Sequence, residues 1–181
     1  MSIKNKSLFI LLLTLSFLSA QSRIVVDLGG KQKVSVLGMS DKSDTGLGIT
    51  FGYDHMLSDY TGIGFESQLN RSITQDGEDA GKFGFTSVYG VGKYDLGSGY
   101  GVARVGYSLL YNGDEEYSGD VDLKGGLMFG LGAGFKLSDN MSIEAGYYSN
   151  AGTGTVKEGG MTLEMETTYT RINASLVYSM K

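Results

Sequence analysis

Residues 124–149, KGGLMFGLGAGFKLSDNMSIEAGYYS, decide the fold because they predict two alternating β-strands joined by a tight polar turn at residues 138–140. Apolar side chains occupy every second position on both sides of the turn: Leu127, Phe129, Leu131, Ala133, Phe135, Leu137, Met141, Ile143, Ala145 and Tyr147. Apart from Met128, the positions between them hold glycine, polar and charged residues. An apolar face opposite a small, polar face is typical of a transmembrane β-barrel, whose apolar side chains contact lipid and whose polar side chains face the lumen.

The first twenty residues predict a cleaved secretory signal peptide, which leaves residues 21–181 as one barrel domain. Lys4 and Lys6 precede an apolar run at residues 8–18, and the small residues Ser19 and Ala20 follow it. This run is shorter than the roughly 20 residues that a membrane-spanning helix needs. The chain has no cysteine, so neither disulfides nor a lipid-anchored start is expected.

Composition and charge restrict the possible classes of protein. The 29 glycines could indicate a disordered chain, but 12 tyrosines, 8 phenylalanines and regular alternation argue against disorder. The net charge of −5 becomes −7 once the two lysines of the signal peptide are removed. An acidic chain does not favour nucleic acid as a partner.

Turn spacing predicts an all-β fold, an eight-stranded antiparallel up-and-down transmembrane β-barrel. Short polar turns at residues 58–60, 97–99 and 138–140 alternate with longer, acidic segments at 37–44, 74–81 and 112–125 and a tip at 159–160. Short periplasmic turns and longer extracellular loops are typical of outer-membrane barrels. The expected strands are residues 23–36, 45–57, 61–73, 82–96, 100–111, 126–137, 141–157 and 162–180.

Alternation within the strands also predicts which side chains face lipid. The lipid-facing set of strands two to five is Leu47, Ile49, Phe51, Tyr53, Ile63, Phe65, Leu69, Phe83, Phe85, Tyr89, Val91, Val105, Tyr107, Leu109 and Tyr111. Two aromatic girdles are expected at the membrane interfaces. The turn-side girdle is Tyr53, Tyr60, Tyr94, Tyr100, Phe135 and Tyr178, and the loop-side girdle is Phe83, Tyr107, Tyr111 and Phe129.

The mature chain resembles the small eight-stranded outer-membrane barrels typified by the transmembrane domain of outer-membrane protein A and by outer-membrane protein X, most specifically at GLGAGFKLSDNMSIEAGYYS (130–149). The resemblance implies a monomer in the outer membrane, in contact with lipid and lipopolysaccharide and inserted by the outer-membrane assembly machinery. That machinery reads an aromatic residue at the end of the last strand, whereas here Tyr178 is the nearest aromatic to the end. A surface adhesion or defence role, through host or surface proteins bound by the loops, is also implied, without a cofactor.

Five charged side chains are expected near mid-barrel on the lumen face: Asp27, Glu66, Arg104, Glu144 and Arg171. An eight-stranded barrel is just wide enough for side chains to fill its interior. The cluster is therefore interpreted as a structural plug, with a gated ion path as the alternative. Glu144 and Arg171, on neighbouring strands, are the expected pair.

Two further groups of residues suggest chemistry only weakly, and we predict no catalytic residue. His55 is the only histidine, yet Asp54 and His55 point to opposite faces of a strand, so an interfacial histidine is favoured over a lipid-modifying enzyme that uses Ser58. Acidic residues of the third loop could form a weak cation site, although a solvated acidic rim is favoured because their spacing does not match a calcium loop. They are Asp114, Glu115, Glu116, Asp120 and Asp122.

The last two predicted strands are longer than a membrane requires, so residues 156–167 are expected to protrude. Their facing also changes, since Leu163 and Met165 take the inward register while Glu164 and Glu166 take the outward one. Protruding strand edges could pair with a partner. The sequence thus predicts a structural or surface-interaction protein with a plugged lumen rather than an enzyme, and the alternative is a narrow channel for ions or small solutes.

Overall fold

The computed structural model describes residues 20–75, 78–112, 121–158 and 161–180, and nearly all of them lie in antiparallel strands. The strands are β1 (Ala20–Val36), β2 (Met39–Thr45), β3 (Gly48–Met56), β4 (Thr61–Gln68), β5 (Arg71–Gln75), β6 (Glu78–Asp95), β7 (Gly99–Asn112), β8 (Val121–Lys136), β9 (Met141–Glu158) and β10 (Met161–Ser179). All but the last residue of the predicted signal peptide lies outside the described residues. The described residues contain no helix that is long and apolar enough to cross a membrane.

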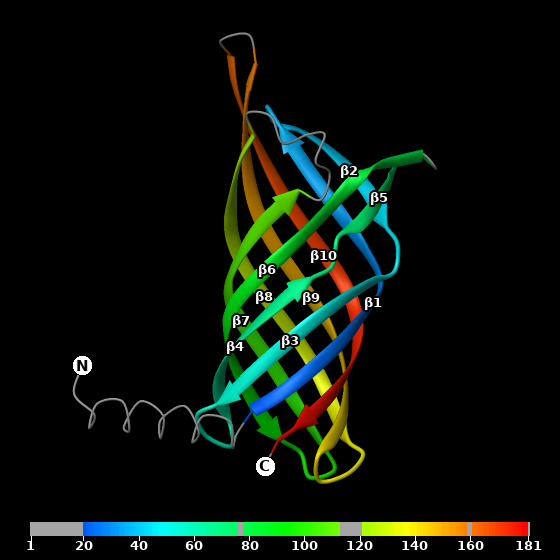
Figure 1. The fold of residues 1–181 in the computed structure, drawn as a ribbon, viewed down its shortest axis with the longest axis vertical. Coiled ribbons are helices and arrows are strands. Elements are labelled where there is room, and N and C mark those ends of the chain that lie inside the picture. The colour runs from blue at the N-terminus through cyan, green and yellow to red at the C-terminus, as the bar shows by residue number, and fades with distance from the viewer. Residues whose placement is uncertain (1–19, 76–77, 113–120, 159–160, 181) are drawn as a thin grey trace, which may run out of the picture.

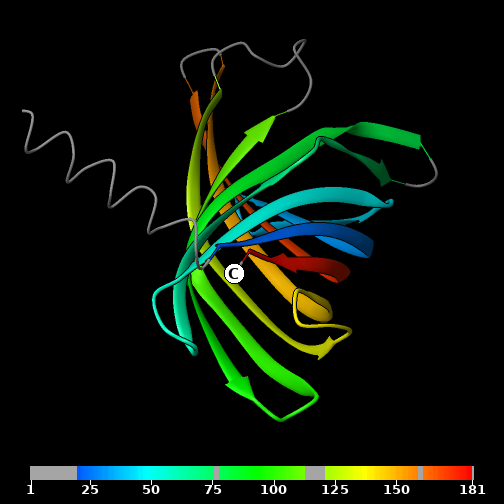
Figure 2. The same ribbon diagram turned by 60° about the horizontal axis from the view of Figure 1, so that its bottom comes forward.

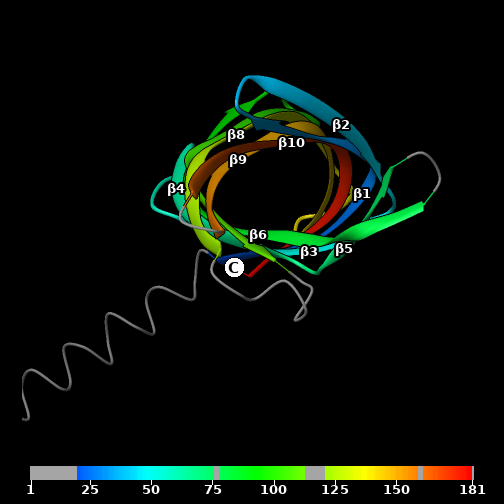
Figure 3. The same ribbon diagram turned by 90° about the horizontal axis from the view of Figure 1, so that it is seen from above.

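Eight of the strands close into a ring in the order β1, β3, β4, β6, β7, β8, β9 and β10 (Figures 1 and 3). Closure comes from β10, which pairs with β1 from Gln21↔Ser179 to Val36↔Met165. A closed ring pairs the backbone groups of every wall strand, which a bilayer requires because lipid offers no hydrogen bonds. The eight-stranded antiparallel ring predicted from the sequence is therefore confirmed.

Two segments that were expected to be loops contain strands, so this expectation was wrong: β2 begins at Met39 within the segment 37–44, and within 74–81 β5 ends at Gln75 and β6 begins at Glu78. β2 pairs with β1, and β5 pairs with β6 above the membrane part of the barrel. Leu37 and Gly38 have φ angles of 51° and 81°, and they form a two-residue turn that places Val36 opposite Met39. A turn with two positive φ angles matches the twist of a hairpin, so strand pairing continues past the bilayer instead of stopping there.

Apolar side chains cover the outside of the barrel on most strands, as predicted. Exposed outward side chains on β3, β4, β7 and β8 include Ile49, Phe51, Ile63, Phe65, Val105, Tyr107, Leu109, Leu127, Phe129, Leu131 and Phe135. The alternate positions face the interior and are mostly buried. This arrangement reverses that of a soluble barrel and suits a lipid surround.

β6 is turned the opposite way from the prediction. Phe83, Phe85, Tyr89 and Val91 are at most 5% exposed and lie inside the barrel. Their facing follows from the register, since Val91 lies opposite the inward-facing Arg104 and opposite residues of an antiparallel pair share a face. Alternation alone therefore identified the strand but could not choose its inner face.

Two members of the predicted aromatic girdles lie inside the barrel, Phe83 because β6 is turned and Tyr100 because it shares the inward parity of Arg104 along β7. Phe83 lies in the lumen with the rest of the β6 aromatics, and Tyr100 is buried inside β7 at 6% exposure. The side chain of Tyr111 is outside the described part. The remaining girdle residues are exposed or partly exposed on the outer surface: Tyr53, Tyr60, Tyr94, Phe135, Tyr178, Tyr107 and Phe129.

The β9–β10 hairpin extends farthest at one end of the barrel, while the short β6–β7 and β8–β9 turns lie at the other end (Figures 1 and 2). β8 pairs with β9 as far as Val156, and β1 pairs with β10 as far as Met165. Only the residues beyond these two points lack an outer neighbour among the described strands. The protruding part is therefore shorter than the predicted 156–167, because β1 and β8 also extend beyond the bilayer.

Candidate functional site

Nine charged side chains point into the barrel: eight come from the ring strands other than β8, and one comes from β5. They are Arg23 and Asp27 from β1, Asp54 from β3, Glu66 from β4, Arg71 from β5, Lys93 from β6, Arg104 from β7, Glu144 from β9 and Arg171 from β10. Eight of them are at most 4% exposed, and the Lys93 side chain is 10% exposed. We call this set the ion-pair chain because adjacent members alternate in sign.

The periplasmic half of the ion-pair chain runs from Lys93 to Arg23. Lys93 Nζ lies 3.5 Å from Glu144 Oε1, and Arg104 Nη2 lies 3.0 Å from Glu144 Oε2. The same Arg104 nitrogen donates to Asp54 Oδ2 at 2.8 Å, and Asp54 Oδ2 is 3.4 Å from Arg23 Nε. The Asp54 carboxylate therefore links Arg104 on β7 to Arg23 on β1, two strands on opposite sides of the ring.

The extracellular half continues from Arg23 to Arg71. Arg23 Nη2 is 3.3 Å from Glu66 Oε2, and Glu66 Oε1 accepts a 2.7 Å hydrogen bond from Arg171 Nη2. Asp27 lies 3.1 Å from Arg171 Nε and also pairs with Arg71. Every member contacts at least one oppositely charged neighbour, so the nine charges form one connected network.

Tyrosines inside the barrel support the ion-pair chain with neutral hydrogen bonds. Tyr89 donates to Asp54 Oδ1 at 2.7 Å and accepts from Arg23 at 2.6 Å. Tyr148 accepts from Arg104 Nη1 at 2.6 Å, and its ring lies 5.3 Å from the Arg171 guanidinium. These tyrosines thus satisfy some of the donors and acceptors that the ion pairs leave unused, which is favourable because an unsatisfied buried polar group is costly.

Glycines on the inner face of β8 make room for these large side chains. A Cβ atom at Gly130 would overlap the Tyr148 ring, and one at Gly134 would overlap the Tyr100 ring. Side chains of the neighbouring strands β7 and β9 fill the space next to the inner face of β8, which explains why β8 contributes no charge.

An apolar cluster lies on the extracellular side of the ion-pair chain. Phe83 and Tyr169 meet edge to face with ring centroids 5.0 Å apart, and Phe85 stacks on Tyr169 at 6.4 Å. Ile73 and Leu110 pack against them. Tyr169 also accepts a 2.5 Å hydrogen bond from Arg71, so its hydroxyl joins this cluster to the end of the chain of charges.

The ion pairs matter for stability both through the attraction within each pair and through the cost of removing one partner. Two unit charges 4 Å apart attract by about 4 kcal/mol at an effective dielectric constant near 20. Desolvation offsets much of this attraction, but removal of one partner from a buried pair costs about 3–5 kcal/mol because the other charge is left unpaired. The network therefore fixes which strands lie opposite one another and resists the loss of any member.

The structure brings together all five lumen residues named from the sequence: Asp27, Glu66, Arg104, Glu144 and Arg171. Sequence reasoning missed four others, Arg23, Asp54, Arg71 and Lys93. Lys93 was missed because β6 was assigned the wrong inner face, and Arg71 because β5 was not expected as a separate strand. Arg23 shares the parity of Asp27 along β1, and Asp54 directly follows the predicted lipid-facing Tyr53 along β3, so both could have been found.

The predicted pair Glu144–Arg171 is not formed. In the β9–β10 register Glu144 lies opposite Ser175 and Arg171 lies opposite Tyr148. Four residues of strand, about 13 Å at 3.3 Å per residue, therefore separate the two side chains along the barrel. The prediction used the correct neighbouring strands but the wrong register, and each residue pairs with other partners.

The weaker candidates can be placed only in part. Asp54 faces the lumen, whereas the half-buried His55 faces outward, and Ser58 bonds to Thr61 at 2.9 Å, so no serine, histidine and acid are assembled here. Asp122 is exposed and lies 3.6 Å from Lys124. The other acidic loop residues, Asp114, Glu115, Glu116 and Asp120, lie outside the described residues. Within the described part, no three His, Cys, Asp or Glu side chains form a metal-binding group.

No protein-family profile and no curated protein sequence matches this chain. Solved structures do: outer-membrane protein AlkL in lipid bilayers matches with a TM-score of 0.51 and 15% identity, covering 89% of this chain and 90% of AlkL. Neisserial surface protein A matches with a TM-score of 0.50 and 13% identity, covering 87% and 96%. OprG from Pseudomonas aeruginosa has a TM-score of 0.48 and 9% identity, covering 88% and 96%.

These likenesses concern the fold. The matches to AlkL and to Neisserial surface protein A agree with the closed ring, and this ring with its apolar outer surface fits the predicted location in the outer membrane. The chain therefore has the fold of the small eight-stranded outer-membrane β-barrel proteins.

Proposed function

We propose that this protein is a sealed outer-membrane barrel that serves a structural or surface-interaction role rather than transport or catalysis. The ion-pair chain is the observation that carries the proposal, because nine connected charges cross the lumen from Lys93 to Arg71. An ion that crossed this region would have to separate buried pairs and leave unpaired charges behind. That cost is large compared with thermal energy.

The apolar cluster adds a second layer to the proposed seal. Phe83, Phe85 and Tyr169 are at most 3% exposed and face one another directly beyond the charges. Their packed rings narrow the lumen further on the extracellular side of the charges.

The extracellular strand extensions supply the proposed surface role. β2, β5 and the ends of β9 and β10 continue past the barrel wall as hairpins (Figure 1). Outward side chains near the tip include the exposed Glu164 and Glu166. We assign contacts with host or neighbouring surface proteins to these hairpins, and the separation of Asp54 from His55 supports a role without catalysis.

Single-channel recording across a planar bilayer tests the seal, with the full chain isolated from membranes and boiled protein as the control. The native protein is expected to give no unitary steps at moderate voltage. The double variant Arg104→Ser/Glu144→Ser, which opens the centre of the ion-pair chain, is expected to give steps, while the matched exterior variant Lys124→Ser/Asp122→Ser stays silent. Reproducible steps from the native protein would overturn the seal in favour of the channel alternative, with the same charges as its gate.

A further inference from the structure

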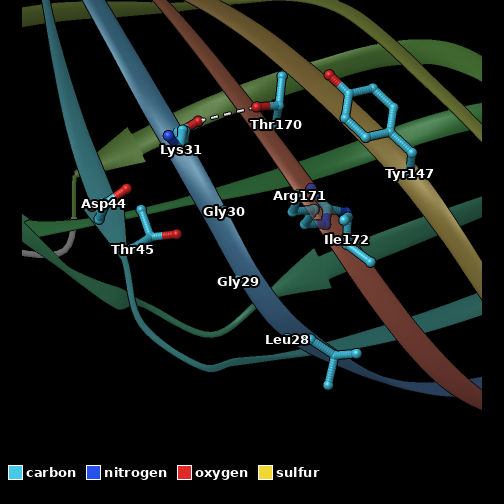
Figure 4. A pocket seen from close by; sticks show the side chains of 10 residues that line it. All are labelled: Leu28, Gly29, Gly30, Lys31, Asp44, Thr45, Tyr147, Thr170, Arg171 and Ile172. Atoms are coloured by element: carbon cyan, nitrogen blue, oxygen red, sulfur yellow. Dashed lines mark hydrogen bonds between the residues drawn. The ribbon is translucent and has the colours of Figure 1, made fainter.

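The outer wall of the barrel carries a groove of about 640 Å³ where β1, β2, β9 and β10 come together (Figure 4). Its lower part is apolar and includes Leu28, Ile172 and Tyr147, which are 46–60% exposed on the outer surface. Its upper part includes Lys31 and Thr170. The volume lies within the 300–1,000 Å³ range of small-molecule sites.

The groove exists because β1 has a bulge followed by two glycines. The register between β1 and β10 shifts between Asp27 and Gly29, so Leu28 is the extra residue. A Cβ at Gly29 would have no heavy atom within 4 Å, while one at Gly30 would overlap Tyr169. Gly29 therefore leaves open space in which a larger residue would fit without strain.

The groove crosses the upper edge of the apolar band. Along β1 the outward side chains change from Leu28 to Lys31, and along β10 they change from Ile172 to Thr170. Lys31 is the first charged outward side chain on β1 beyond the exposed Ile24, Val26 and Leu28. The lysine thus lies at the level of the headgroups on the extracellular side.

Three lysines gather on this outer face at the top of the groove. Lys33 lies directly opposite Lys42 across the β1–β2 hairpin, and Lys31 lies opposite Asp44. Among the described residues no carboxylate lies within ion-pair distance of Lys31, Lys33 or Lys42. Like charges placed opposite each other destabilise a hairpin unless an anion lies between them.

We infer that this groove binds an outer-leaflet lipid of the lipid A type, with one acyl chain along Leu28, Gly29 and Ile172 and a phosphate on Lys31, Lys33 and Lys42. The apolar floor suits a saturated chain, and the lysine triplet suits a phosphate monoester. Asp44 and Glu166, which lies opposite Ser35 beside Lys33, leave a net charge of +1 at the rim when counted with the three lysines. The site belongs to the outer surface and does not depend on whether the lumen is sealed.

Native mass spectrometry of the full chain in phosphatidylcholine nanodiscs that contain bisphosphorylated lipid A measures this binding. The triple variant Lys31→Gln/Lys33→Gln/Lys42→Gln is expected to bind lipid A on the order of a hundredfold more weakly, since each lysine near an anionic surface contributes about fivefold. Gly29→Phe fills the groove and is expected to displace lipid A, whether phosphorylated or dephosphorylated. Lys124→Gln/Lys136→Gln, which removes exposed lysines elsewhere, serves as the matched control and keeps native binding.

Each remaining outcome counts against the inference. Native binding by the triple variant removes the phosphate site, and native binding by Gly29→Phe removes the acyl groove. Complete displacement of lipid A by inorganic phosphate assigns the lysines to a free anion instead of a lipid. Slower migration of the unheated barrel on electrophoresis identifies any variant that has failed to fold, and in that case the milder pair Lys33→Gln and Gly29→Leu repeats the same test.

Discussion

β6 and β8 have nearly the same sequence pattern but opposite orientations. Both alternate glycine with large side chains, yet β8 places Leu127, Phe129 and Leu131 toward lipid, while β6 places Phe85 and Tyr89 in the lumen. The difference shows that the interior of a narrow barrel has room for large side chains from only some of its strands. Large inner residues on β6 and β9 need small ones on the strands beside or facing them, so the orientation of each strand depends on the whole ring.

Adding a side chain to the two glycine faces gives the largest expected contrast. Gly130→Leu on β8 puts four carbons against the Tyr148 ring, which is 2% exposed and held by its hydrogen bond to Arg104. Overpacking usually costs about 1–3 kcal/mol and occasionally more, and here the cost should exceed that range because the added Cβ alone already overlaps the ring, so little folded barrel is expected. Gly90→Leu on β6 points outward, and its Cβ meets only two carbonyl oxygens at 3.9 and 4.0 Å.

Guanidinium unfolding in detergent, followed by the electrophoretic shift of the folded barrel, compares the two variants. Gly90→Leu is expected to match the native midpoint because its side chain enters lipid or detergent. Equal losses from both variants would mean that β6 does not present its glycines to the outside.

Truncating one aromatic on each strand gives the next largest effect. Phe85 is 0% exposed and contacts Phe83 and Tyr169, so Phe85→Ala is expected to cost about 3–5 kcal/mol in the free energy of unfolding. Phe129 is 42% exposed and meets the Tyr147 ring at 6.4 Å, so Phe129→Ala is expected to cost only about 0.5–1.5 kcal/mol. The same unfolding assay measures both, and a larger loss from Phe129→Ala would contradict the inner position of Phe85.

The same comparison explains how much the sequence could predict. Alternation and turn spacing are local properties, so the ring of eight strands and the orientation of β3, β4, β7, β8 and β9 followed from them. The orientation of β6 did not, because its Phe83 and Phe85 resemble lipid-facing residues in every local respect. Only the pairing of Val91 with Arg104 decides the matter, and that contact depends on register.

The pattern of residues along each strand also could not predict which members of the ion-pair chain pair with each other. Five of its nine members were named from the parity of their strands, but the predicted Glu144–Arg171 pair failed because parity does not fix the height of a residue in the barrel. Asp54 and Glu66 each join charges from strands that are not consecutive in sequence. Such contacts require the closed ring, which appears only when β10 meets β1.

The smallest expected effect lies at the periplasmic end, where the ends of β6 and β8 meet. Lys136 Nζ donates to Asp95 Oδ2 at 2.7 Å and to the Gly97 carbonyl at 3.1 Å, and Asp95 Oδ1 accepts from the Gly97 N–H at 2.6 Å. The hydrogen bond from Lys136, followed by that from Gly97, lowers the pKa of Asp95 below its usual 3.8. Both side chains are about half exposed, so solvent weakens the pair.

The Asp95 carboxylate stabilises the fold at pH values above its pKa in the unfolded chain. This stabilisation is lost as the pH falls through the lower pKa that Asp95 has in the folded protein. Asp95→Asn removes that contribution, so the midpoints of native protein and variant should differ at about pH 7 and converge below about pH 4. Asp139→Asn, an exposed acid on the neighbouring turn, is the matched control. Midpoints that differ by the same amount at every pH would mean that the carboxylate charge does not link the two strand ends, and β6 and β8 would then be coupled only through β7.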